Sequence, residues 1–159
     1  MEARSRCQPI DHRLGITQLC RSPDRGGARY KDLKDIDLAT GKLKKTNVPG
    51  TEINHMPSNQ STPLAHGNGP SIQMDEFDHV QTASWGRGAA VDWQMKQAAL
   101  VNNGRIDEAM QMDIDDIVSR FPGKYNNAIG QMIGNLPSNA DFQALRTVPT
   151  GVHVQLTLW

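Results

Sequence analysis

The sequence predicts an α+β domain, with a small β-rich core in the middle of the chain and a mostly helical C-terminal part. Two extended segments, 52–55 and 70–74, are separated by a polar loop whose prolines and glycines disfavour both strand and helix. Asp75 is well suited to cap a helix that follows it directly. Apolar residues then recur at helical spacing through most of the C-terminal half. The predicted core, residues 51–86, therefore has the order strand, loop, strand and helix.

Residues 1–28 are predicted to form an irregular basic arm or linker, because they show no sustained apolar period and are rich in arginine. The domain itself is expected over 29–159, with a short helix or hairpin edge within 29–45. Residues 1–48 contain 11 Lys and Arg against 6 Asp and Glu, and residues 49–159 contain 6 against 11. The formal net charge of zero thus combines a basic front with an acidic remainder.

Three lysines, Lys42, Lys44 and Lys45, come just before the predicted core. In this place they are predicted to approach a phosphate backbone, a contact that gives affinity without reading sequence. A lysine-rich edge that discourages aggregation accounts for them equally well.

Length and composition exclude several classes of protein. The 159 residues suffice for one domain with a modest core and not for two of normal size. Cys7 and Cys20 fit neither a disulfide framework nor a zinc spacing, so we expect free thiols. No apolar run approaches the length of a membrane span, and the N-terminus lacks the apolar core of a signal peptide. We expect no membrane association and, for a protein that leaves its cell, a specialised route.

Three amphipathic helices are predicted within residues 89–136. The first begins at residue 89 and stops at 102–104, the second runs from 105 to a stop at 122–123, and the third covers about 124–136. Their apolar stripes indicate a small helical bundle that supports the core. Residues 137–159 are expected to be irregular until 152–159, where the residues alternate as in a strand.

The second of these helices carries an acidic group. Asp107, Asp113, Asp115 and Asp116 are expected to point mostly outward. Helical spacing places Asp113 and Asp116 on neighbouring surface rather than in a closed metal cage. We therefore predict a solvated face or a protein-docking surface here.

Two histidines in the core are the candidate functional residues. His55 ends the first predicted strand, and His79 lies on the first or second turn of the predicted helix. A strand histidine followed by a helix histidine is one way to build a nuclease site with a single metal ion. His66, in the glycine-rich loop between them, is expected to be solvated.

The segments 52–57 (EINHMP), 69–72 (GPSI) and 78–86 (DHVQTASWG) resemble the toxin nucleases of the His-Me finger (HNH, endonuclease VII-like) superfamily. Such domains occur at the C-terminal ends of bacterial polymorphic toxins of the Rhs and type VI secretion kind. The resemblance extends to about two thirds of the chain. It implies a small ββα-metal core within a helical shell.

The resemblance also implies the roles of individual residues. His55 would be the base that deprotonates water, and Glu52 would orient the histidine-bearing strand or bond a loop amide. His79, Asn54 and Asp78 would supply metal ligands. For Asn54 an orienting role stands beside the ligand role, and both Asx residues are also common in turns and caps for structural reasons. Separately from the resemblance, Arg87 is close in sequence to the helix of His79, where it is predicted either to bind a phosphate or to be an ordinary surface arginine.

The ion implied is one divalent cation. An oxygen-rich ligand set favours magnesium or manganese, whereas two imidazoles would favour zinc or nickel. The expected activity is a metal-dependent endonuclease toxin that hydrolyses nucleic acid, DNA in preference to RNA, in the cytoplasm of a competing bacterial cell. Its expected protein partner is a cognate immunity protein. The alternative is a catalytically inactive interaction module that binds a partner protein or nucleic acid.

Overall fold

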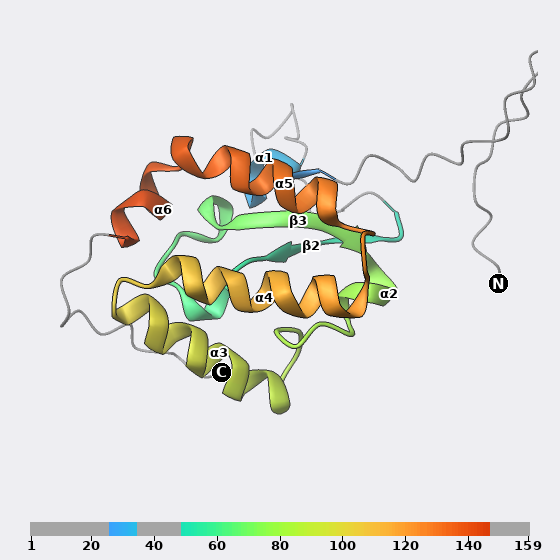
Figure 1. Ribbon diagram of the computed structural model, residues 1–159, viewed down its shortest axis with the longest axis horizontal. Coiled ribbons are helices and arrows are strands. Elements are labelled where there is room, and N and C mark those ends of the chain that lie inside the picture. Colours follow the sequence, from blue (N-terminus) through green and yellow to red (C-terminus); the bar gives the residue numbers. More distant parts are fainter. Residues whose placement is uncertain (1–25, 35–48, 147–159) are drawn as a thin grey trace, which may run out of the picture.

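The computed structural model describes residues 26–34 and 49–146, and these form a mixed α+β fold (Figure 1). Its strands are β1 (Gly27–Arg29), β2 (Thr51–His55) and β3 (Pro70–Asp75). Its α-helices are α1 (Tyr30–Leu33), α2 (Glu76–His79), α3 (Ala89–Asn102), α4 (Ile106–Arg120), α5 (Asn126–Asn135) and α6 (Ala140–Leu145). Single 3₁₀ turns occur at Asn59–Ser61, His66–Asn68 and Leu136–Ser138. The predicted α+β class is confirmed.

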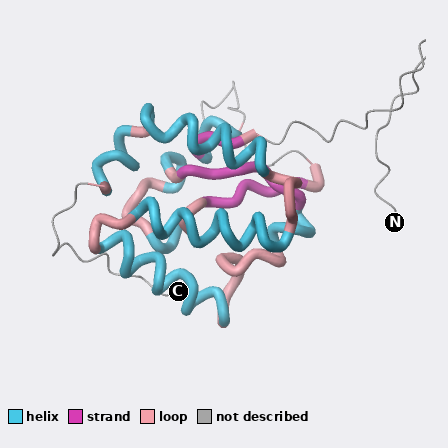
Figure 2. Tube along the Cα trace, viewed as in Figure 1, coloured by secondary structure: helices cyan, strands magenta, loops and turns pink. Residues whose placement is uncertain are grey.

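The three strands form one antiparallel sheet in the order β1-β3-β2. In this register Asn54 lies opposite Ile72, and His55 lies opposite Ser71. The strand, loop, strand and helix order predicted for residues 51–86 is therefore present, with β2, β3 and α2 in the predicted places. The helices make up more of the described chain than the strands do (Figure 2).

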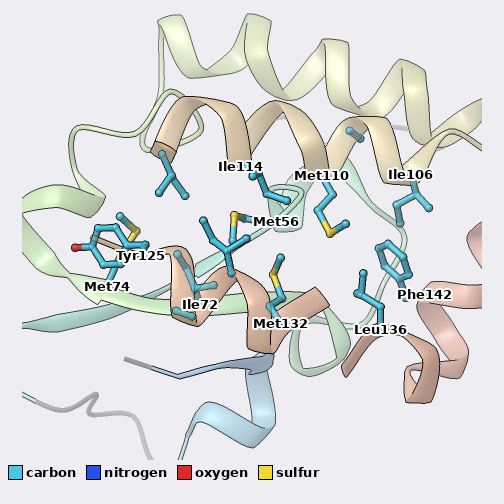
Figure 3. Close-up of a cluster of buried hydrophobic side chains, with 14 of the residues drawn as sticks. Met56, Ile72, Met74, Ile106, Met110, Ile114, Tyr125, Met132, Leu136 and Phe142 are labelled. Atoms are coloured by element: carbon cyan, nitrogen blue, oxygen red, sulfur yellow. The ribbon is translucent and has the colours of Figure 1, made fainter. Parts of the chain in front are cut away.

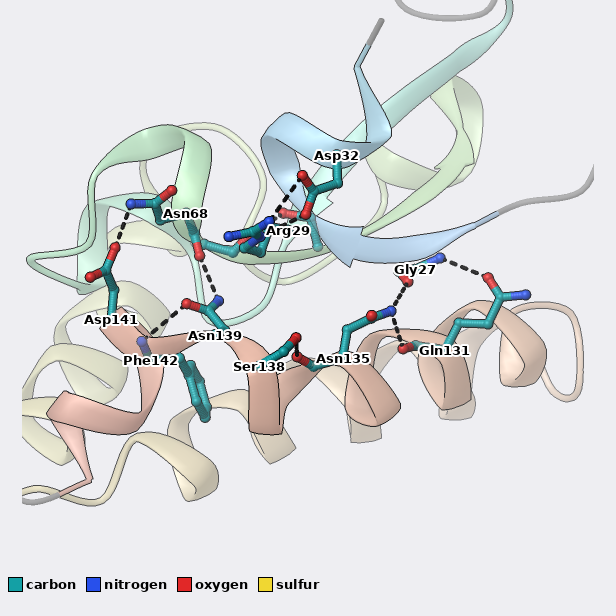
Figure 4. A network of polar contacts seen from close by, with 12 residues as sticks. Gly27, Arg29, Asp32, Asn68, Gln131, Asn135, Ser138, Asn139, Asp141 and Phe142 are labelled. Atoms are coloured by element: carbon teal, nitrogen blue, oxygen red, sulfur yellow. Dashed lines mark hydrogen bonds and ion pairs between the residues drawn. The ribbon is translucent and has the colours of Figure 1, made fainter.

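Strand β1 lies across the boundary predicted between arm and domain, because Gly27 and Ala28 are part of the sheet. A side chain at Gly27 would be 1.8 Å from the carbonyl oxygen of Ala128, so the β1 backbone packs directly on α5. Gly27 N also donates to Gln131 Oε1 (3.1 Å), and Asn135 Nδ2 donates to Gly27 O (3.2 Å; Figure 4). A strand of three residues has too little apolar pattern to be predicted, and α5 supplies what holds it.

A single hydrophobic cluster lies between the sheet and the long helices (Figure 3). Ile72 and Met74 of β3 are fully buried against side chains of α4 and α5, among them Ile117 and Met132. Burial of each such side chain contributes about 1.5–3 kcal/mol relative to exposure. The helices α4 and α5 lie beside the strands and α3 packs on α4 (Figure 1). All three begin within two residues of the predicted starts.

Two expectations for the C-terminal half are wrong. Residues 140–145 form α6 instead of irregular chain, since Asn139 Oδ1 caps the helix by accepting from Phe142 N (3.2 Å) and the Phe142 ring is buried in the core (Figure 4). Asp113 does not point outward: it is 2% exposed and accepts hydrogen bonds from Trp93 Nε1 (2.8 Å) and Gln97 Nε2 (2.7 Å). The predicted strand 152–159 lies outside the described residues.

None of the helices within residues 26–34 and 49–146 is long and apolar enough to cross a membrane.

Candidate active site

A cleft of about 420 Å³ brings together several of the predicted site residues. It lies at the end of β2 and is walled by the loop after β2, by α2 and by the turn before α3. His55 and His79, 24 positions apart in the chain, both line it, together with Asn54 and Arg87. Among the described residues that line the cleft, none is an Asp or a Glu. The described part of the lining therefore carries one permanent positive charge, on Arg87, and no carboxylate.

His55 is held in one orientation by its surroundings. Its side chain stacks on the ring of Tyr30 with centroids 4.6 Å apart and the planes 13° from parallel. Its Nε2 lies 2.9 Å from the carbonyl oxygen of His66. Because a carbonyl oxygen only accepts, Nε2 carries the ring proton, and Nδ1 is the nitrogen left with a lone pair. Gly69 leaves the space for this ring, since a side-chain carbon there would be 2.7 Å from His55 Cδ2.

Burial makes His55 a neutral imidazole. The residue is 8% exposed, and desolvation lowers its pKa from 6.5 to about 4, although the hydrogen bond to the His66 carbonyl works in the opposite direction. At neutral pH the ring is therefore uncharged and carries a single proton. Desolvation also lowers the pKa of His66, with a smaller contribution from Lys34. His66 is exposed, as predicted, but its ring also packs against Tyr30 and His55.

His79 enters the cleft from the last residue of α2 and is paired with Glu52. The contact joins His79 Nδ1 to a carboxylate oxygen of Glu52 on β2. Glu52 was predicted to orient the histidine-bearing strand or to bond a loop amide. In the structure its carboxylate contacts the His79 ring instead. A carboxylate on one ring nitrogen fixes the orientation of the ring and leaves the other nitrogen, Nε2, able to donate a lone pair.

Asn54 is the unusual polar group of the site. Its side chain is 4% exposed and lines the cleft, yet its amide Nδ2 has no hydrogen-bond partner among the described residues. A buried amide without a partner costs about 1–3 kcal/mol, so such groups are rare unless a ligand satisfies them.

Asp78 is placed differently from the prediction that it ligates a metal. It does not line the cleft, and its carboxylate accepts from Lys124 Nζ (2.5 Å) and Tyr125 Oη (2.5 Å). Lys124 also forms an ion pair with Asp75 (2.9 Å). These contacts fasten both ends of α2 to the start of α5, so Asp78 positions the helix that carries His79. The predicted phosphate ligands Lys42, Lys44 and Lys45 lie outside the described residues.

The donors present fit a divalent cation with few protein ligands. The described part of the chain contains no group of three or more His, Cys, Asp or Glu side chains that could hold a metal ion. His79 and Asn54 do line the cleft, and the oxygen and nitrogen of the unsatisfied Asn54 amide exchange places by a flip of the amide plane. Magnesium commonly keeps several waters beside one or two protein ligands and substrate phosphates.

Two features of the site were not predicted from the sequence. Tyr30 belongs to a separate segment near the N-terminus, and its stacking on His55 depends on α1 lying beside β3. Trp85 lines the cleft with 47% of its surface exposed, although the sequence offered only the motif in which it stands.

Comparison of the chain with family models, curated proteins and solved structures found no significant match. The geometry of the cleft therefore carries the functional argument.

Proposed function

We propose that this cleft hydrolyses phosphodiester bonds in nucleic acid with the help of one divalent cation. The observation that carries the proposal is that His55 and His79, from separate elements, line one cleft. The absence of carboxylates from the described lining and the presence of Arg87 support an anionic substrate.

His55 is the general base of the proposed reaction. Its Nδ1 takes a proton from the attacking water, while its Nε2–H remains hydrogen-bonded to the His66 carbonyl oxygen. With a pKa lowered to about 4, the ring is uncharged throughout the neutral range, so the lone pair of Nδ1 is available to the attacking water. Tyr30 holds the ring plane, so the base does not need to be ordered when substrate binds.

His79 and Asn54 would hold the cation, with Glu52 orienting His79. The ion supplies positive charge for the scissile phosphate and the leaving oxygen. Magnesium or manganese suits an imidazole, an amide and waters, with zinc or nickel as the alternatives. Arg87 adds a second positive group on the cleft wall.

A cleavage assay on supercoiled plasmid and on single-stranded DNA and RNA, each with and without EDTA, tests the proposal. We expect EDTA-sensitive cleavage by the wild type and a loss of about 10²–10⁴-fold in rate for His55→Ala, the usual contribution of a general base. Glu108→Ala is the control, because Glu108 lies on the surface of α4 and pairs only with Arg105 in the described chain. Cleavage by His55→Ala at the wild-type rate would remove His55 as the base.

The resemblance extends the proposal to a toxin that acts in the cytoplasm of a competing bacterium and is neutralised by an immunity protein. Expression in the bacterial cytoplasm tests this part. The wild type should stop growth and His55→Ala should not. If the wild type binds nucleic acid or protein but does not cut with magnesium, manganese, zinc or nickel, the result would favour the non-catalytic interaction module instead.

A further inference from the structure

We propose that the cleft selects single-stranded nucleic acid, with the exposed indole of Trp85 as the surface on which one unpaired base stacks. The inference rests on the proposed function for its choice of ligand and deepens it by naming the substrate class. It is carried by an exposed aromatic face on the wall of a cleft without described carboxylates, together with a buried amide that lacks a partner.

The backbone that carries Trp85 is fixed, while its ring is uncovered. Trp85 N donates to Thr82 O (3.2 Å), and Ala83 N donates to Asp116 Oδ2 (2.8 Å). On the other side of the turn, Gln94 Nε2 donates to Ser84 O (3.1 Å). The turn is thus fastened to both α3 and α4, and Trp85 is nevertheless 47% exposed. A rigid backbone with an uncovered ring provides a stacking surface at little entropic cost.

The rest of the cleft complements a nucleotide. Arg87 follows Trp85 by two residues and supplies a positive charge on the same wall. Asn54 also lines the cleft, and its Nδ2 is buried without a partner in the described chain. The cleft volume of about 420 Å³ is at the lower end of the range for pockets that enclose a small organic ligand. These groups match one nucleotide rather than an extended groove.

The exposed indole distinguishes single strands from duplexes. In a duplex both faces of each base are covered by neighbouring bases, so an indole gains a stacking partner only if a base is unpaired or flipped. Every base has a π-face, so stacking on Trp85 would recognise single strands with little sequence preference. Nothing in the ring contact itself separates DNA from RNA, because stacking does not involve the 2′-hydroxyl.

Fluorescence anisotropy in EDTA tests the inference without cleavage. The probes are labelled single-stranded DNA and RNA of about 10 nucleotides, within the usual site sizes, and the matching DNA duplex. We expect the full-length wild type to bind the single strands more tightly than the duplex. Trp85→Leu should weaken single-strand binding by about 5- to 150-fold, which corresponds to ~1–3 kcal/mol per stacked base. Trp85→Phe should retain most of the affinity, since a smaller aromatic face remains.

Phe77→Leu is the matched control, because Phe77 is 77% exposed on α2 but does not line the cleft. It should bind as the wild type does. Equal affinity for single strands in Trp85→Leu and wild type, or tighter binding of the duplex, would overturn the inference. These outcomes are separate from failure of the proposed function, which would appear as no cleavage with any cation. Comparison of the DNA and RNA probes identifies which single strand is preferred.

Discussion

Replacement of Gly69 by alanine is the most direct test of how the fold prepares His55. Gly69 has φ −64° and ψ 136°, a conformation that alanine adopts without strain. Its added methyl carbon would be 2.7 Å from His55 Cδ2 and 3.5 Å from Nε2. The shorter distance is far inside van der Waals contact, so the imidazole must leave its present position between Tyr30 and the His66 carbonyl. The substitution therefore displaces the His55 ring without changing any ionisable group.

The size of the effect follows from the pKa of His55. Burial lowers it from 6.5 to about 4, a difference that corresponds to about 3 kcal/mol between the two protonation states. A ring displaced toward water regains part of its hydration, so in Gly69→Ala we expect the His55 pKa to rise from about 4 toward 6.5. Overpacking itself destabilises by about 1–3 kcal/mol, offset by ~0.4–1 kcal/mol because alanine restricts the unfolded chain.

The sign of the accompanying stability change is opposite to that of a histidine in an ion pair. Because the folded-state pKa of His55 is below 6.5, protonation opposes folding. Its contribution to the free energy of unfolding is fully present above about pH 6.5 and is lost as the pH falls through about 4. In Gly69→Ala this acid-side loss should shrink, because the displaced ring takes up a proton more easily.

Proton NMR titration of the histidine ring signals measures the pKa directly, with His55→Asn used to assign the His55 signal. Gly67→Ala is the control, since the nearest atom to its added methyl is Lys31 Cβ at 3.4 Å. That variant should leave the His55 titration unchanged. If Gly69→Ala titrates at the wild-type midpoint, the clash is relieved elsewhere and the account of Gly69 as the space for the ring is refuted.

Two further predictions concern the groups around this site. Burial raises the pKa of Asp113 from 3.8 to about 7, so its contribution to stability is present below about pH 4 and lost as the pH rises through 7, a change on the order of 4 kcal/mol. Chemical denaturation across this pH range should show that the free energy of unfolding of the wild type falls with rising pH relative to that of Asp113→Asn. Parallel curves of unfolding free energy against pH for the two proteins would contradict the prediction. Loss of the carboxylate in Glu52→Ala should weaken divalent-ion binding by about 10–100-fold in calorimetry, because His79 loses the group that orients it. Glu76→Ala, a carboxylate exposed on the same helix as His79, should bind the ion normally, and an equal loss in both variants would indicate a general charge effect.

The sequence alone was sufficient for the order of elements in the core and for the starts of the three long helices. These features depend on local signals, namely apolar periodicity and the proline and glycine in the loop. Asp75 does precede α2, but its side chain makes no capping hydrogen bond and forms an ion pair with Lys124. The same signals placed His55 at a strand end and His79 on a short helix, and the structure has both there. Short elements such as β1 and α6 were not predicted, because each contains too few residues for an apolar period to be recognised.

The partners of the site residues were decided by the tertiary structure. Tyr30 on His55, Glu52 on His79 and Lys124 with Tyr125 on Asp78 all join positions 25 or more residues apart in the chain. Such contacts depend on how the helices pack against the sheet, and no local period contains that information. The sequence therefore determined which residues could take part in the chemistry. Packing determined which of them face the cleft, because burial and long-range hydrogen bonds set the direction of these side chains and, for His55, the protonation state.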